Sequence, residues 1–184
     1  ANARPAVLQE WVTGVPGSDW PPAAATPGAW VRLMSHAASG LDAAHRVGLT
    51  HGRLTSDSFV LTPDGTVKLV GVGDPPWLIG ATDDASPEAD LRALGQIAFG
   101  WSQLGGAGVR KRGRGKGFPD PLVAVVRRLE GDPAAPDAEP IVPYASAAEL
   151  VEDLRRLATS YPCPRADWDA VLQGNPDAPL RQSA

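Results

Sequence analysis

The sequence predicts a mainly helical α+β domain: a helical bundle around one central helix, with a single small β-hairpin. Two long stretches, residues 30–44 and 91–104, carry apolar residues at the spacing of one helix face. Between them, two apolar runs flank the turn at residues 62–65, whose Pro, Asp and Gly favour a hairpin. The second long helix is apolar enough to be the central one.

Capping residues mark the ends of the long helices. Thr26 and Pro27 are typical start signals for the first helix, and Gly48 is a typical stop. Ser86 and Pro87 start the second helix in the same way.

Shorter elements are predicted on either side of this pair. A short strand is expected over residues 6–12, near the start of the chain. Further helices are expected over residues 122–129, after the capping box at residues 146–149, and around residues 168–172. The basic, glycine-rich segment 105–117 is predicted to be a loop.

Composition and charge limit the function classes. With 184 residues, 43% of them hydrophobic, the chain can bury one ordinary core. A net charge of -4 and a pI near 5.3 argue against a nucleic-acid partner. The single cysteine, Cys163, excludes a disulfide framework within the chain and indicates a reducing, cytoplasmic location. No apolar run approaches the roughly 18 residues of a membrane span, so we expect no membrane contact by this domain.

Four local sequences, in this order along the chain, resemble the C-terminal lobe of a protein kinase of the bacterial Ser/Thr type. Residues 8–14 (LQEWVTG) resemble the last strand of the N-terminal lobe and the hinge. Residues 51–61 (HGRLTSDSFVL) stand where the family has its catalytic loop, H-R-D-L-x-x-x-N. Residues 68–73 (KLVGVG) stand where it has the metal-binding D-F-G, and residues 90–95 (DLRALG) resemble the start of its central helix.

This resemblance implies a domain organisation. A kinase-like C-terminal lobe is expected over residues 1–160, starting at the hinge strand. Residues 161–184 are expected to form a C-terminal extension with a short helix and a polar tail. Because the chain begins at Ala1 and enters a strand-like stretch at once, we expect it to be a piece of a longer protein, with an N-terminal lobe or further domains outside it.

The departures from the family pattern concern the residues that carry its chemistry. Arg53 stands in place of the catalytic Asp, and an arginine cannot act as a base at neutral pH. Ser58 replaces the metal-binding Asn and Gly71 replaces the metal-binding Asp, so no carboxylate remains there to hold magnesium. The resemblance therefore implies a catalytically inactive pseudokinase without a metal site.

Other residues keep the family pattern. Asp90 is expected to be buried and to accept N–H bonds from the loop around His51, itself expected to be a packed loop residue. Glu10 and Val12 stand at hinge positions, and Val60 stands where the family forms the floor under adenine. No cofactor is required by this interpretation, but ATP binding stays open.

The remaining candidates are interpreted as ordinary residues. His36 and His45, on the first helix, are expected to be ordinary surface or snorkelling residues, and the acids Asp57 and Asp74 are expected in turns. The basic run 110–116 is interpreted as a solvated loop. Most tryptophans are expected in the core, whereas Trp20, in a proline-rich segment, is a candidate partner contact.

Two functions follow from the sequence. The first is a catalytically inactive pseudokinase domain that acts as a protein-binding or regulatory scaffold. The alternative is a divergent Ser/Thr protein kinase or an ATP-binding domain, completed by an N-terminal lobe outside this chain. A glycine-rich phosphate loop and a later lysine upstream of Ala1 would favour the alternative.

Overall fold

The computed structural model describes residues 10–20, 26–73, 85–107, 118–131 and 141–173. Within these residues the chain forms β1 (Val15–Pro16), the 3-10 helix η1 (Gly17–Asp19), α1 (Pro27–Arg46), the 3-10 helix η3 (Ser56–Ser58), β2 (Phe59–Leu61), β3 (Val67–Leu69), α3 (Pro87–Ala107), α4 (Asp120–Glu130), α5 (Ala147–Ser160) and α6 (Arg165–Gln173). The predicted fold class, mainly helical with one small hairpin, is confirmed.

Helix α1 begins and ends where its capping residues predict. The Thr26 side chain accepts a hydrogen bond from the Ala29 N–H at 3.2 Å, and Pro27 is the first helical residue. Gly48 follows the end of the helix with φ +76°, a conformation that a residue with a Cβ rarely adopts. One long face of α1 is buried, including Leu33, Met34 and Leu41.

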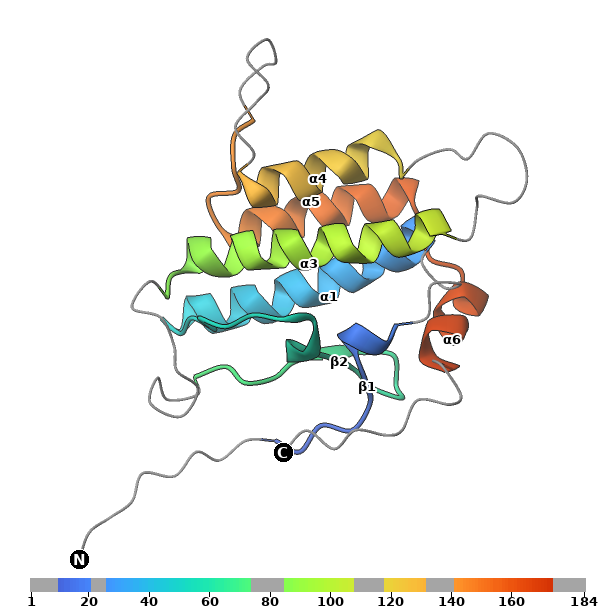
Figure 1. Cartoon of the computed structure of the whole chain (residues 1–184), viewed down its shortest axis with the longest axis horizontal. Helices are drawn as coiled ribbons and strands as arrows, with labels where there is room; N and C mark the ends of the chain where they lie inside the picture. Colours follow the sequence, from blue (N-terminus) through green and yellow to red (C-terminus); the bar gives the residue numbers. More distant parts are fainter. Residues whose placement is uncertain (1–9, 21–25, 74–84, 108–117, 132–140, 174–184) are drawn as a thin grey trace, which may run out of the picture.

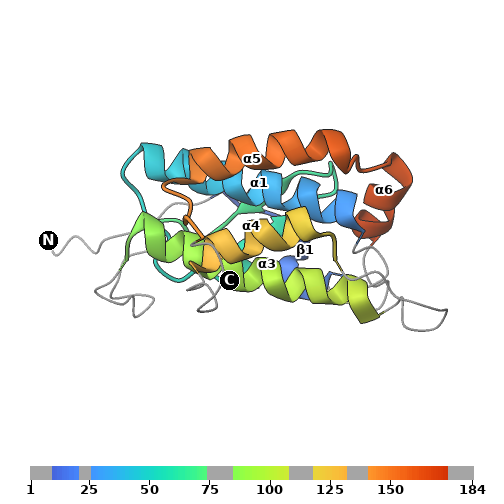
Figure 2. The same ribbon diagram turned by 90° about the horizontal axis from the view of Figure 1, so that it is seen from above.

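The four helices α1, α3, α4 and α5 run side by side and form the bundle (Figures 1 and 2). Helix α5 packs along α1, and α4 packs along α3. Gly95 permits the close approach of the second pair, because a Cβ at this position would lie 2.9 Å from the Cβ of Leu129 on α4. The core between the helices includes Leu94, Leu122 and Leu150, each with no exposed surface. Helix α3 packs against both α1 and α4.

The sheet is antiparallel, with strand order β1-β2-β3, and lies against α1 (Figure 1). The predicted hairpin is observed: Phe59 pairs with Leu69 and Leu61 pairs with Val67. The predicted strand over residues 6–12 is wrong in its described part, because residues 10–12 are not a strand; residues 6–9 lie outside the described residues. The strand that pairs with β2 is instead Val15–Pro16, which joins at the sheet edge, where a proline is tolerated.

Helix α6 packs into the same core as the bundle. Trp168 is 3% exposed, and its Nε1–H donates to the Gly65 carbonyl oxygen at 3.1 Å, in the hairpin turn. Val171, also on α6, is buried. The division of the chain at residue 160 stays a prediction. Nowhere in the described part of the chain is a helix both long enough and apolar enough to span a membrane.

Two expectations about loops and tryptophans need correction. Helix α3 continues to Ala107, so the first residues of the predicted loop 105–117 are helical. The glycines in this stretch do not end the helix. Residues 108–117 lie outside the described part. Trp20 is not an exposed contact, since its ring stacks on Trp101 with ring centroids 4.9 Å apart. The most exposed described tryptophan is Trp11, with 64% of its surface accessible.

Candidate functional site

The site lies where the loop after α1 meets the N-terminus of α3, and Asp90 is its centre. The Asp90 side chain is 1% exposed. Its Oδ2 accepts the backbone N–H of His51 at 2.8 Å, and its Oδ1 accepts the backbone N–H of Gly52 at 2.9 Å. The burial and both predicted N–H bonds are therefore observed.

His45 adds a third donor to the same carboxylate. Its Nε2 lies 2.9 Å from Asp90 Oδ2, and its side chain is 11% exposed. His45 was expected to be an ordinary surface or snorkelling residue, but its ring bonds to the buried Asp90, because the last turn of α1 ends directly beside the start of α3. One carboxylate thus joins α1, α3 and the loop between α1 and β2.

His51 joins this loop to the end of β3. Its Nε2–H donates to the Val70 carbonyl oxygen at 2.9 Å, and the residue is 7% exposed. The Arg53 N–H points to His51 Nδ1 at 3.4 Å. Because Nδ1 is turned to a donor, the proton of a neutral ring lies on Nε2. His51 is a packed loop histidine, and both ring nitrogens are used in holding the loop.

The second half of the loop closes on itself at η3. The Thr55 N–H donates to Ser58 Oγ at 3.1 Å, and the Ser58 N–H donates to the Thr55 carbonyl oxygen at 3.0 Å. Ser58 is 7% exposed, and its own carbonyl oxygen accepts from the Val70 N–H at 2.8 Å. The Ser58 hydroxyl therefore serves the turn, where the family pattern has a metal ligand.

The other two degenerate positions differ in exposure and backbone conformation. Arg53 is exposed. Gly71 has φ +81° and follows β3 directly, so the chain leaves the hairpin in a conformation that favours glycine. Neither residue offers an oxygen ligand or a base from its side chain.

The acids Asp57 and Asp74, which lie near these positions in the sequence, have another contact or lie outside the described residues. Asp57 is exposed and accepts a hydrogen bond from the Ser18 hydroxyl, which ties η3 to η1. Asp74 belongs to the undescribed residues. Across the described ranges, no group of three or more His, Cys, Asp or Glu side chains is arranged to hold a metal ion.

The residues that the sequence interpretation assigned to a hinge and an adenine floor differ in burial. Glu10 is exposed and forms an ion pair with Lys68 on β3, and Val12 is half-buried. Val60 is 4% exposed. A Cβ built on Gly14 would lie 2.9 Å from a methyl group of Val60, so the chain before β1 packs closely over this residue.

His36, also expected to be an ordinary surface or snorkelling residue, is half-buried and bonds to a backbone group. Its Nδ1 accepts the Val67 N–H at 3.0 Å, which connects α1 to the outer edge of β3. Burial, together with the nearby Arg32 charge, lowers the pKa of His36, although Asp64 opposes this shift. The ring is therefore neutral at pH 7, with its proton on Nε2.

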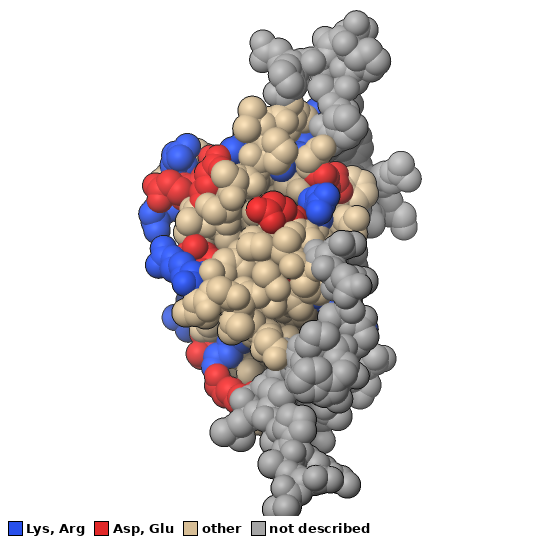
Figure 3. Space-filling model, turned by 90° about the vertical axis from the view of Figure 1, so that its left-hand side faces the viewer, with Lys and Arg blue, Asp and Glu red and all other residues tan. Residues whose placement is uncertain are grey.

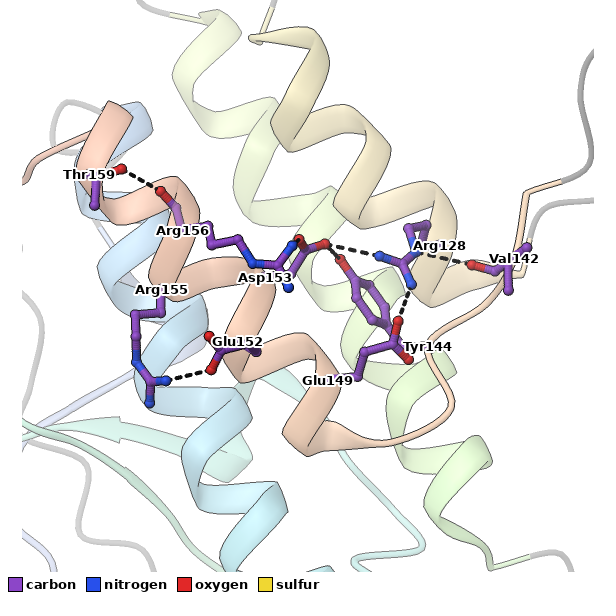
Figure 4. Close-up of polar contacts among 9 residues, drawn as sticks. All are labelled: Arg128, Val142, Tyr144, Glu149, Glu152, Asp153, Arg155, Arg156 and Thr159. Carbon is purple, nitrogen blue, oxygen red and sulfur yellow. Dashed lines mark hydrogen bonds and ion pairs between the residues drawn. The ribbon is translucent and has the colours of Figure 1, made fainter.

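Sequence reasoning also missed a polar cluster around Arg128, which joins α4, α5 and the segment before α5 (Figure 4). The Arg128 side chain binds Glu149 and Asp153, and its guanidinium lies 3.8 Å from the ring centroid of Tyr144. The Tyr144 hydroxyl donates to Asp153 at 2.6 Å, and burial and this bond raise the pKa of Tyr144.

The capping box before α5 is the one sequence feature that points to this cluster. The Glu149 N–H donates to Ser146 Oγ at 3.3 Å, as predicted. The reciprocal bond goes one residue earlier, from the Ala145 N–H to the Glu149 carboxylate at 2.9 Å. This bond and the Arg128 side chain lower the pKa of Glu149. The cluster is a structural connection between helices, in which every named polar group has a partner.

Comparisons with known proteins find similarity among solved structures. No protein-family model and no curated protein matches this chain. Among solved structures, it is similar to a divergent kinase that lacks the glycine-rich loop and regulates membrane ultrastructure of the Toxoplasma parasitophorous vacuole. The two chains are 21% identical with a TM-score of 0.47, and the match covers 86% of this chain and 53% of that chain. This chain therefore spans about half the length of the structure that it matches.

Proposed function

We propose that this chain is a kinase-like C-terminal lobe that binds a protein partner and does not transfer phosphate. The proposal rests on one observation. Asp90 holds the loop as the kinase pattern implies, but the loop does not carry the catalytic side chains of that pattern. The buried carboxylate fixes the loop at His51 and Gly52, as the kinase pattern implies. At the positions where the kinase pattern has its base and a metal ligand, the same loop carries Arg53 and Ser58.

Each chemical role fails for its own reason. A guanidinium at Arg53 carries its charge at every physiological pH, so it cannot take a proton from a substrate hydroxyl. The Ser58 hydroxyl is engaged by the Thr55 N–H, and glycine at position 71 has no ligand atom. Because phosphoryl transfer depends on metal ions and on a positioned base, losing all three roles leaves little catalysis.

The surface at the C-terminal end of α1, where this loop lies, supports a partner-binding function. The C-terminal end of α1 lies on the left in Figure 1, the side that Figure 3 shows. In the middle of that face most atoms belong to uncharged residues, and Lys, Arg, Asp and Glu lie mainly along its left edge and in its upper part (Figure 3). Two apolar residues directly after α1, Val47 and Leu49, are 70% and 44% exposed. Neighbouring exposed apolar side chains such as these two are found at many protein interfaces.

The proposal includes a longer protein, in which an N-terminal lobe or further domains stand before this lobe. It also includes a cytoplasmic location, supported by the single Cys163, whose thiol pKa is raised by burial. A relationship to bacterial Ser/Thr kinases is part of the same proposal.

A phosphate-transfer assay on the longest natural protein tests the inactive state. With radiolabelled ATP, generic protein substrates and Mg²⁺ or Mn²⁺, we expect no transfer above that of a buffer blank, while an active kinase run in parallel labels the substrate. Transfer that is abolished by Asp57→Asn would establish the alternative, a divergent kinase. A thermal-shift titration with ATP, with and without Mg²⁺, separates nucleotide binding from catalysis.

The binding role needs its own experiment. A photo-crosslinking amino acid at position 47 or 49 should give a discrete crosslinked species in cells, whereas the same amino acid at the exposed helical position Arg155 should not. The same species from all three positions, or none from positions 47 and 49, would contradict an interface at the end of α1.

A further inference from the structure

A cavity of about 280 Å³ lies on the opposite end of α1 from the kinase-like loop, and no step of the proposed function uses it. It lies between the first turns of α1, the end of α5 and the segment that leads to α6, a region where Figures 1 and 2 show the three helices close together. Its lining includes Arg32, Ser35, His36, Ala158, Tyr161 and Cys163.

Arg32 supplies the positive charge of the cavity. The guanidinium carbon lies 4.4 Å from the ring centroid of Trp168, so the group is stacked on the indole face. The guanidinium also interacts with the Cys163 side chain beside it. A stacked guanidinium leaves its in-plane N–H groups pointing away from the ring, the geometry in which arginine binds phosphate and carboxylate groups. Within the described ranges, no carboxylate lies within ion-pair distance of Arg32. The nearby acid Asp167 instead accepts the Thr26 hydroxyl at 3.0 Å.

His36 supplies a neutral donor. Because its Nδ1 accepts the Val67 N–H, its proton lies on Nε2, and no acceptor for that proton is found in the described part of the chain. The ring also packs edge-on against Trp168, with ring centroids 6.0 Å apart. Trp168 thus fixes both Arg32 and His36 from one side.

The remaining polar lining groups are those of Tyr161, Cys163 and Ser35. The Tyr161 hydroxyl has no hydrogen-bond partner among the residues that the structure describes, and it can donate. Burial is the main cause that raises the pKa of Cys163, so its thiol is uncharged at neutral pH. Ser35 already donates to the Val31 carbonyl oxygen at 2.7 Å, which leaves its oxygen as an acceptor only.

The size and the donors of the cavity select the ligand. At about 280 Å³ the space is below the usual range for drug-sized ligands or nucleotides, so it fits one small group. Donors come from three different residues, and a phosphate group has three strong acceptor oxygens where a carboxylate has two. We propose that the cavity beside Arg32, His36 and Tyr161 binds a phosphate group, either as inorganic phosphate or as a phosphate monoester.

Calorimetric titration of the full chain with inorganic phosphate, at constant ionic strength with chloride as the balancing anion, tests this site. We expect saturable binding to the wild type and about tenfold or greater weakening in Arg32→Met, because a charge-assisted bond pair is lost. Arg92→Met is the matched control, since it removes the same charge from an exposed position on α3 and should bind phosphate like the wild type. Arg32→Lys, which keeps the charge without the planar fork, should bind with intermediate affinity.

A second variant keeps the test decisive if Arg32→Met does not fold. Ala158 lines the cavity from an exposed position on α5, so Ala158→Leu should fill part of the space, keep the helix and abolish binding. Titrations with O-phosphoserine and with serine identify the source: binding of O-phosphoserine supports a monoester, and binding of inorganic phosphate alone supports the free ion. Phosphate binding that is unchanged in Arg32→Met and Ala158→Leu, or acetate binding as strong as phosphate binding, overturns the proposal.

Discussion

Replacing Asp90 with alanine tests how the start of α3 holds the loop after α1. The substitution leaves two backbone N–H groups, those of His51 and Gly52, and the His45 ring without their acceptor. A hydrogen bond to a charged group contributes about 1.5 kcal/mol or more, so the two backbone donors account for about 3 kcal/mol. The His45 ring is slightly exposed and can turn to water, so it adds at most about 1 kcal/mol.

A loss of about 3–4 kcal/mol is a large part of the stability of a domain of this size. It corresponds to a fall in Tm of roughly 6–16 °C, at about 2–4 °C for each kcal/mol. The measurement is urea unfolding followed by far-UV circular dichroism, together with thermal unfolding.

Glu88→Ala is the matched control, because Glu88 is an exposed acid in the same first turn of α3. It removes the same favourable interaction with the helix N-terminus and should lose at most about 1 kcal/mol. Equal losses for Asp90→Ala and Glu88→Ala would refute the argument, since the loop contacts would then contribute nothing.

Three further substitutions test other parts of the molecule. Burial lowers the pKa of His36, so as the pH falls below 6.5 the unfolded chain takes up a proton before the folded chain does, and stability falls. In urea unfolding from about pH 7 to 5, His36→Asn should lose less stability than the wild type, and an equal loss would contradict the assignment. Gly71→Ala should lower the free energy of unfolding by about 1 kcal/mol because of the φ of +81° at this position. Gly100→Ala, in open space on α3, should be neutral or stabilising. Similar losses of stability in both variants would exclude the backbone conformation as the cause. Arg128→Ala should lower the free energy of unfolding by about 2 kcal/mol in the same assay. The Arg156 side chain is 69% exposed, so Arg156→Ala should lower it by less than about 0.5 kcal/mol. The reverse order would be evidence against the cluster in Figure 4.

The helices could be predicted from sequence because their causes are local. Thr26 and Pro27 start α1 through a cap that spans four residues, and Gly131 ends α4 in the left-handed conformation that glycine favours. The hairpin was predictable for the same reason, since its turn residues are adjacent. Strand β1 was not, because two residues that pair with β2 more than forty positions later carry no local pattern.

The site shows the same division between local and distant causes. The burial of Asp90 was expected because residues 90–95 resemble a kinase motif. The apolar periodicity of the helix alone would not have indicated a buried acid at this position. His36 and His45 were misplaced because their partners, Val67 and Asp90, lie 31 and 45 residues away. A histidine on the first helix has the same local sequence signature whether its ring reaches water or a distant backbone group.

The bond between Trp168 and Gly65 has a consequence for the order in which the chain is made. The two residues are 103 positions apart, and at roughly 5–20 residues per second a ribosome needs about 5–20 s to synthesise the intervening segment. The partner helix of α1, α5, is also made about a hundred residues after it. During this interval the nascent chain carries the apolar face of α1 without its final cover, a state in which chains aggregate or bind chaperones. Slowing translation within residues 66–146 should therefore lower the yield of folded protein more than slowing it before residue 27.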